Sequence, residues 1–179
     1  MRDISAASQA ALEQRNIRSR DFIRFTVRNR DNGSDVVATY WSDVGAISAD
    51  IINPETQATE TETFLGAGTL ISVSPVPLAS NLSVQTTSVE LSSVSNANDL
   101  VRQYDAKQGK VEVFRGQFEL DSMTQVSPAY PRFFGFIDEP DILTPAENDE
   151  GGISRNCVSH TQELTRSNAA TRSDAYQKQ

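Results

Sequence analysis

The chain has 179 residues and a formal net charge of −8, a length that suits one domain or one domain with an extension. This acidic balance argues against a general nucleic-acid binder, which needs a basic face to displace counterions from the phosphates. The single cysteine excludes an intramolecular disulfide and a metal cluster held by several cysteines. Because no apolar run resembles a signal peptide or reaches membrane-spanning length, we expect a soluble protein that is not secreted.

The first predicted element is a short helix within residues 1–16. Asp3 can cap it, because a carboxylate at that position accepts hydrogen bonds from the first turn. Ile4 and Ala7 begin an apolar face at helical spacing. We expect the helix to end near Asn16, a residue type that tolerates the left-handed conformation.

A β-hairpin is predicted next. In residues 23–28 apolar and polar side chains alternate, which indicates a half-buried strand with a basic outer face. Residues 31–33 read Asp-Asn-Gly, a strong signal for a tight turn. Residues 36–41 then return as the second strand.

Basic residues concentrate at the beginning of the chain. Residues 1–30 carry seven arginines and a balance of +4, whereas residues 31–179 carry a balance of −12. This division fits a repeated assembly with oppositely charged faces, and it also fits an ordinary solvated basic face. Because the planar guanidinium suits bidentate contacts across interfaces, we predict interface roles for Arg24, Arg28 and Arg30 against an acidic neighbouring subunit.

Further strands are predicted between the hairpin and the middle of the chain. Residues 44–52 are apolar and β-branched, and Asn53 with the following proline should end that strand. The polar, acidic residues 55–63 predict an exposed loop or an edge strand protected by charge. Residues 69–74 predict another strand, which ends at Pro75.

The segment 82–143 has a fixed order of strand, helix, hairpin, loop and strand. The apolar positions change parity between Leu82 and Val89, which predicts a β-bulge between them. A helix is expected at 98–104 and should end by Gly109.

The hairpin of this segment is expected to turn at Arg115 and Gly116. Pro128 and Pro131 predict a loop after it, because proline cannot donate to a strand ladder. Residues 132–138 are then expected to form a strand.

The C-terminal region combines an acidic segment, one strand and a tail. Residues 139–152 are acidic and contain prolines and glycines, so we expect mostly loop, followed by a strand at 153–160. Residues 165–179 are polar and have no core face, which predicts a tail that is disordered alone or ordered by a partner. Further candidate interface residues lie in this tail: Arg166, Arg172 and Tyr176.

These elements predict a mainly β fold. Many short strands at close spacing favour a compact β-barrel or sandwich, with a short N-terminal helix and one helix inserted between strands. We expect three parts: an N-terminal helix at 1–16, a β-rich domain at 17–164 and the tail at 165–179.

The candidate chemical sites have weak signatures. Cys157 and His160 could form a nucleophile pair, but three residues apart on a strand means opposite faces. The acidic residues 139–150 do not fit a Ca²⁺ loop or a glycosidase carboxylate pair. Tyr40 and Trp41 are more typical of a barrel core than of a ligand site. We therefore expect no catalytic residue, no cofactor and no metal site.

The order of features resembles the hub proteins of phage tail tips and gene transfer agents, the baseplate hub family. The segments that carry this resemblance, in chain order, are Asp21-Phe-Ile-Arg-Phe-Thr-Val27, Phe64-Leu-Gly-Ala-Gly68, Val89-Glu-Leu91, the expected short helix Asn98–Tyr104, Gly109-Lys-Val-Glu-Val-Phe-Arg-Gly116 and Phe133-Phe-Gly-Phe-Ile-Asp-Glu-Pro140. Many family members also carry a C-terminal cysteine cluster for an iron–sulfur centre. This chain has one cysteine, so that function is not carried over.

The resemblance implies a virion component that is made in the host cytoplasm and located at the tail tip. Hub proteins form a ring, usually a homotrimer, between the distal tail ring protein and the central tip or fibre protein. Such a ring serves host attachment and genome ejection, and it forms part of the DNA channel. An acidic lumen would let DNA pass without specific binding, because like charges repel.

Three alternatives stay open. The chain could be another ring component, namely a distal tail, tube-terminator or neck protein, which a six-fold ring would indicate. It could be a cell-wall-degrading tip enzyme that uses Glu139 or Glu147. It could also be a carbohydrate-binding β-module that uses Tyr40 and Trp41.

Overall fold

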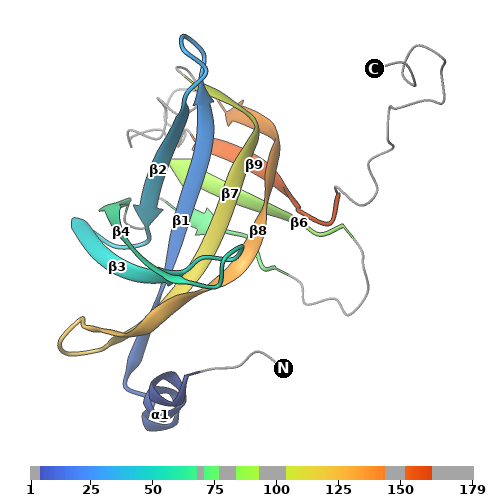
Figure 1. The fold of residues 1–179 in the computed structure, drawn as a ribbon. Helices are drawn as coiled ribbons and strands as arrows, with labels where there is room; N and C mark the ends of the chain where they lie inside the picture. Colours follow the sequence, from blue (N-terminus) through green and yellow to red (C-terminus); the bar gives the residue numbers. More distant parts are fainter. Residues whose placement is uncertain (1–4, 68–70, 77–83, 93–103, 144–151, 163–179) are drawn as a thin grey trace.

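The computed structural model describes residues 5–67, 71–76, 84–92, 104–143 and 152–162. The chain is mainly β and contains a closed six-stranded β-barrel with one short helix, which confirms the predicted fold class (Figure 1). The elements are α1 (Ala6–Gln14), β1 (Ile17–Asn29), β2 (Asp35–Trp41), β3 (Ala46–Ile52), β4 (Thr59–Gly66), β5 (Ile71–Val73), β6 (Thr86–Ser92), β7 (Tyr104–Glu119), β8 (Gln125–Leu143) and β9 (Gly152–Ser159).

The barrel is formed by six strands in the order β3-β4-β2-β1-β7-β8, and it closes where β3 pairs with β8 at Ile51 and Ala129. Aromatic rings fill much of its interior. Phe22 lies at their centre, with its ring centroid 4.7 Å from that of Phe64 and 5.9 Å from that of Trp41. The barrel is therefore a packed core around β1 and not an open tube.

A second layer covers the outer face of the barrel. The far half of β8 leaves the barrel and pairs with β9. In the same sheet β9 pairs with β6, and β6 pairs with β5. Ile23 in β1 packs in this outer core together with Val89, Ile137 and Cys157. Because Phe22 lies in the barrel core and its neighbour Ile23 in the outer core, β1 is buried on both faces.

The N-terminal helix docks against the long strand β8. The side chain of Ser5 caps α1 by accepting a hydrogen bond from Ser8 N, and Arg15 ends it in the left-handed conformation. The backbone N–H of Ser5 donates to the Tyr130 hydroxyl at 2.8 Å. The helix ends near Asn16 as predicted, but the left-handed residue is Arg15. Ser5 supplies the cap that was expected from Asp3, which lies outside the described residues.

The hairpin of β1 and β2 confirms the predicted turn at residues 31–33, with Gly33 at a φ of +70°. β3 ends at Ile52 as expected. Of residues 55–63, which were predicted as a loop or an edge strand, residues 59–63 belong to β4 and residues 55–58 form the turn before it. Most of β4 pairs only with β3, because its pairing with β2 covers two positions, Tyr40↔Leu65 and Trp41↔Gly66.

The turn predicted at Arg115 and Gly116 is wrong, because β7 continues through both residues to Glu119. A Cβ added at Gly116 would come within 2.6 Å of the Phe22 ring. The glycine is thus explained by the close approach of an aromatic ring and not by a turn.

The loop predicted around Pro128 and Pro131 is also wrong, since both lie in the single strand β8. Three register shifts interrupt its pairing with β7, and bulges accommodate residues that cannot donate to a ladder. β8 also extends through residues 139–143, which were expected to be loop. Tyr104 begins β7 and is not helical.

Some predictions fall outside the described residues. These are the helix at 98–103, the parity change after Leu82, residues 144–151 with Glu147, and the tail at 165–179 with Arg166, Arg172 and Tyr176.

Candidate functional site

Two cross-strand ion pairs join β1 to β7. Arg24 in β1 lies opposite Glu112 in β7, and Asp21 lies opposite Arg115 in the same ladder. Side chains three residues apart on a strand point to opposite faces. The first pair therefore lies on the barrel side of the sheet and the second on its outer side.

The inner pair is almost completely buried. Arg24 has 8% and Glu112 has 1% of its surface exposed. Arg24 Nη2 donates to Glu112 Oε1 at 3.0 Å, and Nη1 donates to Glu60 Oε2 at 3.1 Å. The guanidinium also lies over the Phe114 ring, 5.7 Å from its centroid. We call Arg24, Glu112, Glu60, Glu62 and Lys110 the barrel ion cluster.

The charges of the barrel ion cluster stabilise one another. Burial alone would lower the pKa of Arg24, but the hydrogen bonds and charges of Glu112 and Glu60 outweigh it and raise that pKa above its ordinary value. A hydrogen bond from Asn53 lowers the pKa of Glu60, and the hydrogen bond from Arg24 lowers it further. Arg24 thereby connects β1 to β4 where the latter is not paired with β2. We call this unpaired stretch between β2 and β4 the seam of the barrel, and the barrel ion cluster holds it together.

This arrangement corrects the prediction of a basic outer face at Arg24. Arg24 shares its side of β1 with Phe22, which lies in the barrel core. Its guanidinium is taken up by carboxylates of the same chain, so it is not an exposed interface residue in this structure.

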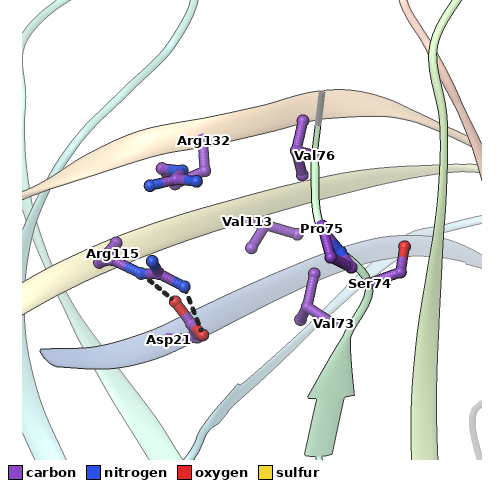
Figure 2. A pocket seen from close by; sticks show the side chains of 8 residues that line it. All are labelled: Asp21, Val73, Ser74, Pro75, Val76, Val113, Arg115 and Arg132. Carbon is purple, nitrogen blue, oxygen red and sulfur yellow. Dashed lines mark hydrogen bonds and ion pairs between the residues drawn. The ribbon is translucent and has the colours of Figure 1, made fainter. Parts of the chain in front are cut away.

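The outer pair lines a hollow on the surface of the barrel. Arg115 Nε donates to Asp21 Oδ1 at 2.8 Å and Nη2 to Oδ2 at 3.1 Å, a bidentate pair. The hydrogen bonds that Arg115 donates to Asp21 raise the pKa of Arg115 against the opposing effect of burial. We call the hollow of about 280 Å³ the arginine hollow (Figure 2), and its lining residues are Asp21, Val73, Ser74, Pro75, Val76, Val113, Arg115 and Arg132.

Arg28 and Arg30 lie at the end of the barrel where β1 turns into β2, and both are exposed. Arg28 lies opposite Asp35 in β2 and opposite Asp105 in β7. The three residues line a second hollow of about 270 Å³. The predicted basic face is thus reduced to this end of β1, where acidic residues flank it.

The remaining candidates lie apart from both ion pairs. Cys157 is fully buried in the outer core. His160 is exposed, and its ring lies 5.1 Å from Phe134 between centroids. Tyr40 and Trp41 are 6% and 4% exposed, so neither ring offers a face for a sugar, and the carbohydrate alternative is wrong for these residues.

The sequence contains a signal for the two ion pairs, and the predictions from the sequence did not use it. Asp21-Phe-Ile-Arg24 and Glu112-Val-Phe-Arg115 both place an acid, two apolar residues and an arginine in a row. When two such segments pair antiparallel, each acid meets the other segment's arginine. Arg132, in contrast, has no comparable signal, because a bulge in β8 determines its place.

The chain was compared with known proteins. No family model matches the chain, and a search among curated proteins finds no relative. Within the described ranges, no group of three or more His, Cys, Asp or Glu side chains is placed to hold a metal ion. In that same part of the chain, no helix has the length and apolar character needed to cross a bilayer.

Proposed function

We propose that this protein is a structural subunit of a phage or phage-like tail tip. Its ring would join the distal tail ring to the central tip or fibre protein and form part of the DNA channel. The resemblance to hub proteins supports this proposal through strand β6 and the central part of β8. The hairpin expected at Arg115 and Gly116 no longer supports it, because β7 continues there.

The observation that carries the proposal is the difference between the two ends of β2. At one end, Val44 is 77% exposed and Leu65, opposite Ala46 in the neighbouring ladder, is 49% exposed. At the other end lie the exposed Arg28 and Arg30. A strand of seven residues separates them, which corresponds to about 20 Å.

A subunit stacked within a tail needs two different contact surfaces, one for each neighbour. Exposed apolar side chains that gather at one place favour burial against another chain. Exposed arginines favour an acidic neighbour, because guanidinium groups make directional contacts with carboxylates. Val44 with Leu65 therefore forms our proposed apolar contact surface, and Arg28 with Arg30 forms the proposed basic one.

Analytical ultracentrifugation of the purified chain tests this assignment. We expect a trimer at high protein concentration and its dissociation in the variants Val44→Glu and Leu65→Glu. Val84→Glu is the matched control, because Val84 is also exposed, at 38%, but precedes β6 in the second layer. A sixfold ring would favour a distal tail, tube-terminator or neck protein. A monomer at all concentrations, or release of peptidoglycan fragments by the purified chain, would contradict the proposal.

A further inference from the structure

We propose that strand β2 binds an extended segment of another protein as an additional strand along its free edge. Within the described residues, β2 pairs with β4 at two positions only, Tyr40↔Leu65 and Trp41↔Gly66. Residues 35–39 pair with β1 on one side and with no described strand on the other. Figure 1 shows β4 meeting β2 near the arrowhead of β2. The free edge borders the seam, and binding there would be independent of the tail-tip role.

The backbone of this edge points toward the seam at alternate residues. Ser42 N donates to a β1 carbonyl at 3.0 Å, and bonded and non-bonded pairs alternate along an antiparallel ladder. The even-numbered residues of β2 therefore bond to β1, and the odd-numbered ones face away from it. Trp41 agrees with this, because its carbonyl accepts a hydrogen bond from Ala67 N. Val37 and Thr39 thus present backbone N–H and C=O groups that no described residue bonds.

The free edge of β2 lacks the features by which proteins usually prevent strand addition. Residues 35–39 read Asp-Val-Val-Ala-Thr, without Lys or Pro, and their pairing with β1 has no register shift. Val37 is 53% exposed, although it lies on the same side of β2 as the barrel-core residue Trp41. At the β5 edge, in contrast, the strand is only Ile71–Val73 and Pro75 follows it. The β2 edge is therefore better suited to another strand.

The side chains beside the edge specify which segment fits. Glu62 reaches the seam on the inner side, because it lies 3.7 Å from Arg24, which is opposite Thr39 in the ladder. Its carboxylate accepts no hydrogen bond from a described residue, and its side chain is 35% exposed. On the outer side, Val36 and Ala38 pack against the outer core. A segment with a basic residue on its inner side and apolar residues on its outer side complements both.

A second copy of this chain fits the edge less well. The barrel ion cluster holds three carboxylates and two cations, an excess of one negative charge. Pairing β2 with β2 of another copy would bring two such clusters toward each other, and like charges repel. The edge therefore favours a basic segment of a different chain.

Amide hydrogen exchange of the wild-type chain, followed by NMR, tests the proposal. The probe is acetyl-Ser-Val-Arg-Val-Thr-Val-Ser-amide, which has one basic residue on one side and valines on the other. We expect it to bind with a Kd on the order of 0.1 mM. When most of the protein is bound, the amides of Val37 and Thr39 should exchange about fivefold more slowly. The amides of Val36 and Ala38 are the internal control, because they already bond to β1 and should change much less.

Modified peptides separate strand addition from other binding. N-methylation of the three valines blocks the N–H groups on one edge of the peptide, and N-methylation of its arginine and threonine blocks the other edge. We expect one of these peptides to bind at least about tenfold more weakly and the other to bind unchanged, since only one edge pairs with β2. Replacing the arginine of the peptide by glutamate should also weaken binding.

Two variants of the chain complete the test. Val37→Pro removes an N–H that faces the seam and should weaken binding, because the added strand loses one donor. Glu62→Gln should weaken binding of the arginine peptide about threefold, as for a partly exposed charge pair. Glu90→Gln, on β6, is the matched control and should have no effect.

Four results would overturn the proposal. These are equal effects of the two N-methylations, equal binding of the glutamate peptide, and unchanged exchange of Val37 and Thr39 at about ten times the expected Kd. The fourth is slower exchange of the same two amides when the protein concentration rises without peptide, which would identify a second copy as the occupant.

Discussion

The two ion pairs between β1 and β7 have the same chemical groups and the same cross-strand geometry, but they lie on opposite faces of the sheet. Arg24 and Glu112 are enclosed by the barrel, whereas the side chains of Asp21 and Arg115 are 27% and 42% exposed. Removing one partner of a buried pair leaves a charge without compensation, while an exposed pair is screened by water. The comparison teaches that burial, and not the residue types, decides how much each pair contributes to the stability of the fold.

The largest expected effect is on the buried side. Glu112→Gln leaves the Arg24 guanidinium without its closest carboxylate, and we expect the free energy of unfolding to fall by about 3 kcal/mol. Urea denaturation measures this change. Glu90→Gln, at an exposed position of β6, is the control and should have almost no effect. A loss below about 1 kcal/mol for Glu112→Gln would mean that the inner pair does not hold the seam.

The packing on the same inner face gives the second prediction. Gly116→Ala places a Cβ against the Phe22 ring, and we expect a loss of about 2 kcal/mol in the free energy of unfolding. Adding Phe22→Leu, which removes the clashing ring atoms, should make the effect of Gly116→Ala smaller. If the alanine cost as much with leucine at position 22 as with phenylalanine, the close approach would not explain the glycine.

The outer pair should matter much less for stability. Asp21→Asn breaks a pair that water already screens, so we expect a loss of less than about 1 kcal/mol by urea denaturation. A loss as large as that of Glu112→Gln would remove the distinction between the two faces.

The smallest expected effect is a dependence on pH. Because the folded state lowers the pKa of Glu60 below its ordinary value of 4.5, Glu60 contributes stability above that value and loses it as the pH falls through the lowered pKa. Wild-type stability should therefore decrease more steeply between pH 5 and 3 than that of Glu60→Gln, by less than about 1 kcal/mol because Glu60 is partly exposed. Parallel pH curves for the two proteins would contradict the role of Glu60 in the cluster.

Local signals predicted the first part of the fold well. The turn at residues 31–33 and the strand ending at Ile52 follow from Asn-Gly and Asn-Pro, whose effects act within a few residues. Gly116 and Pro131 were misinterpreted as breaks, because their positions depend on long-range partners: the Phe22 ring for one and the β7 register for the other.

The candidate sites were harder to predict than the fold. Alternation along β1 suggested one buried face, but a second layer of strands buries the other face as well, so Arg24 could not be placed by parity alone. The acid and arginine spacing shared by the two strands does predict both ion pairs once β1 and β7 are known to be neighbours. That neighbourhood joins residues about ninety positions apart and has no local signal.

The central proposal, a ring subunit at a tail tip, is tested most directly by an image of the particle that carries this chain. We expect a cryo-electron microscopy reconstruction to show three copies in one ring, between the distal tail ring and the central tip or fibre protein. In that ring Val44 and Leu65 should be buried against a neighbouring chain. A ring of six copies or a position away from the tip would contradict the account.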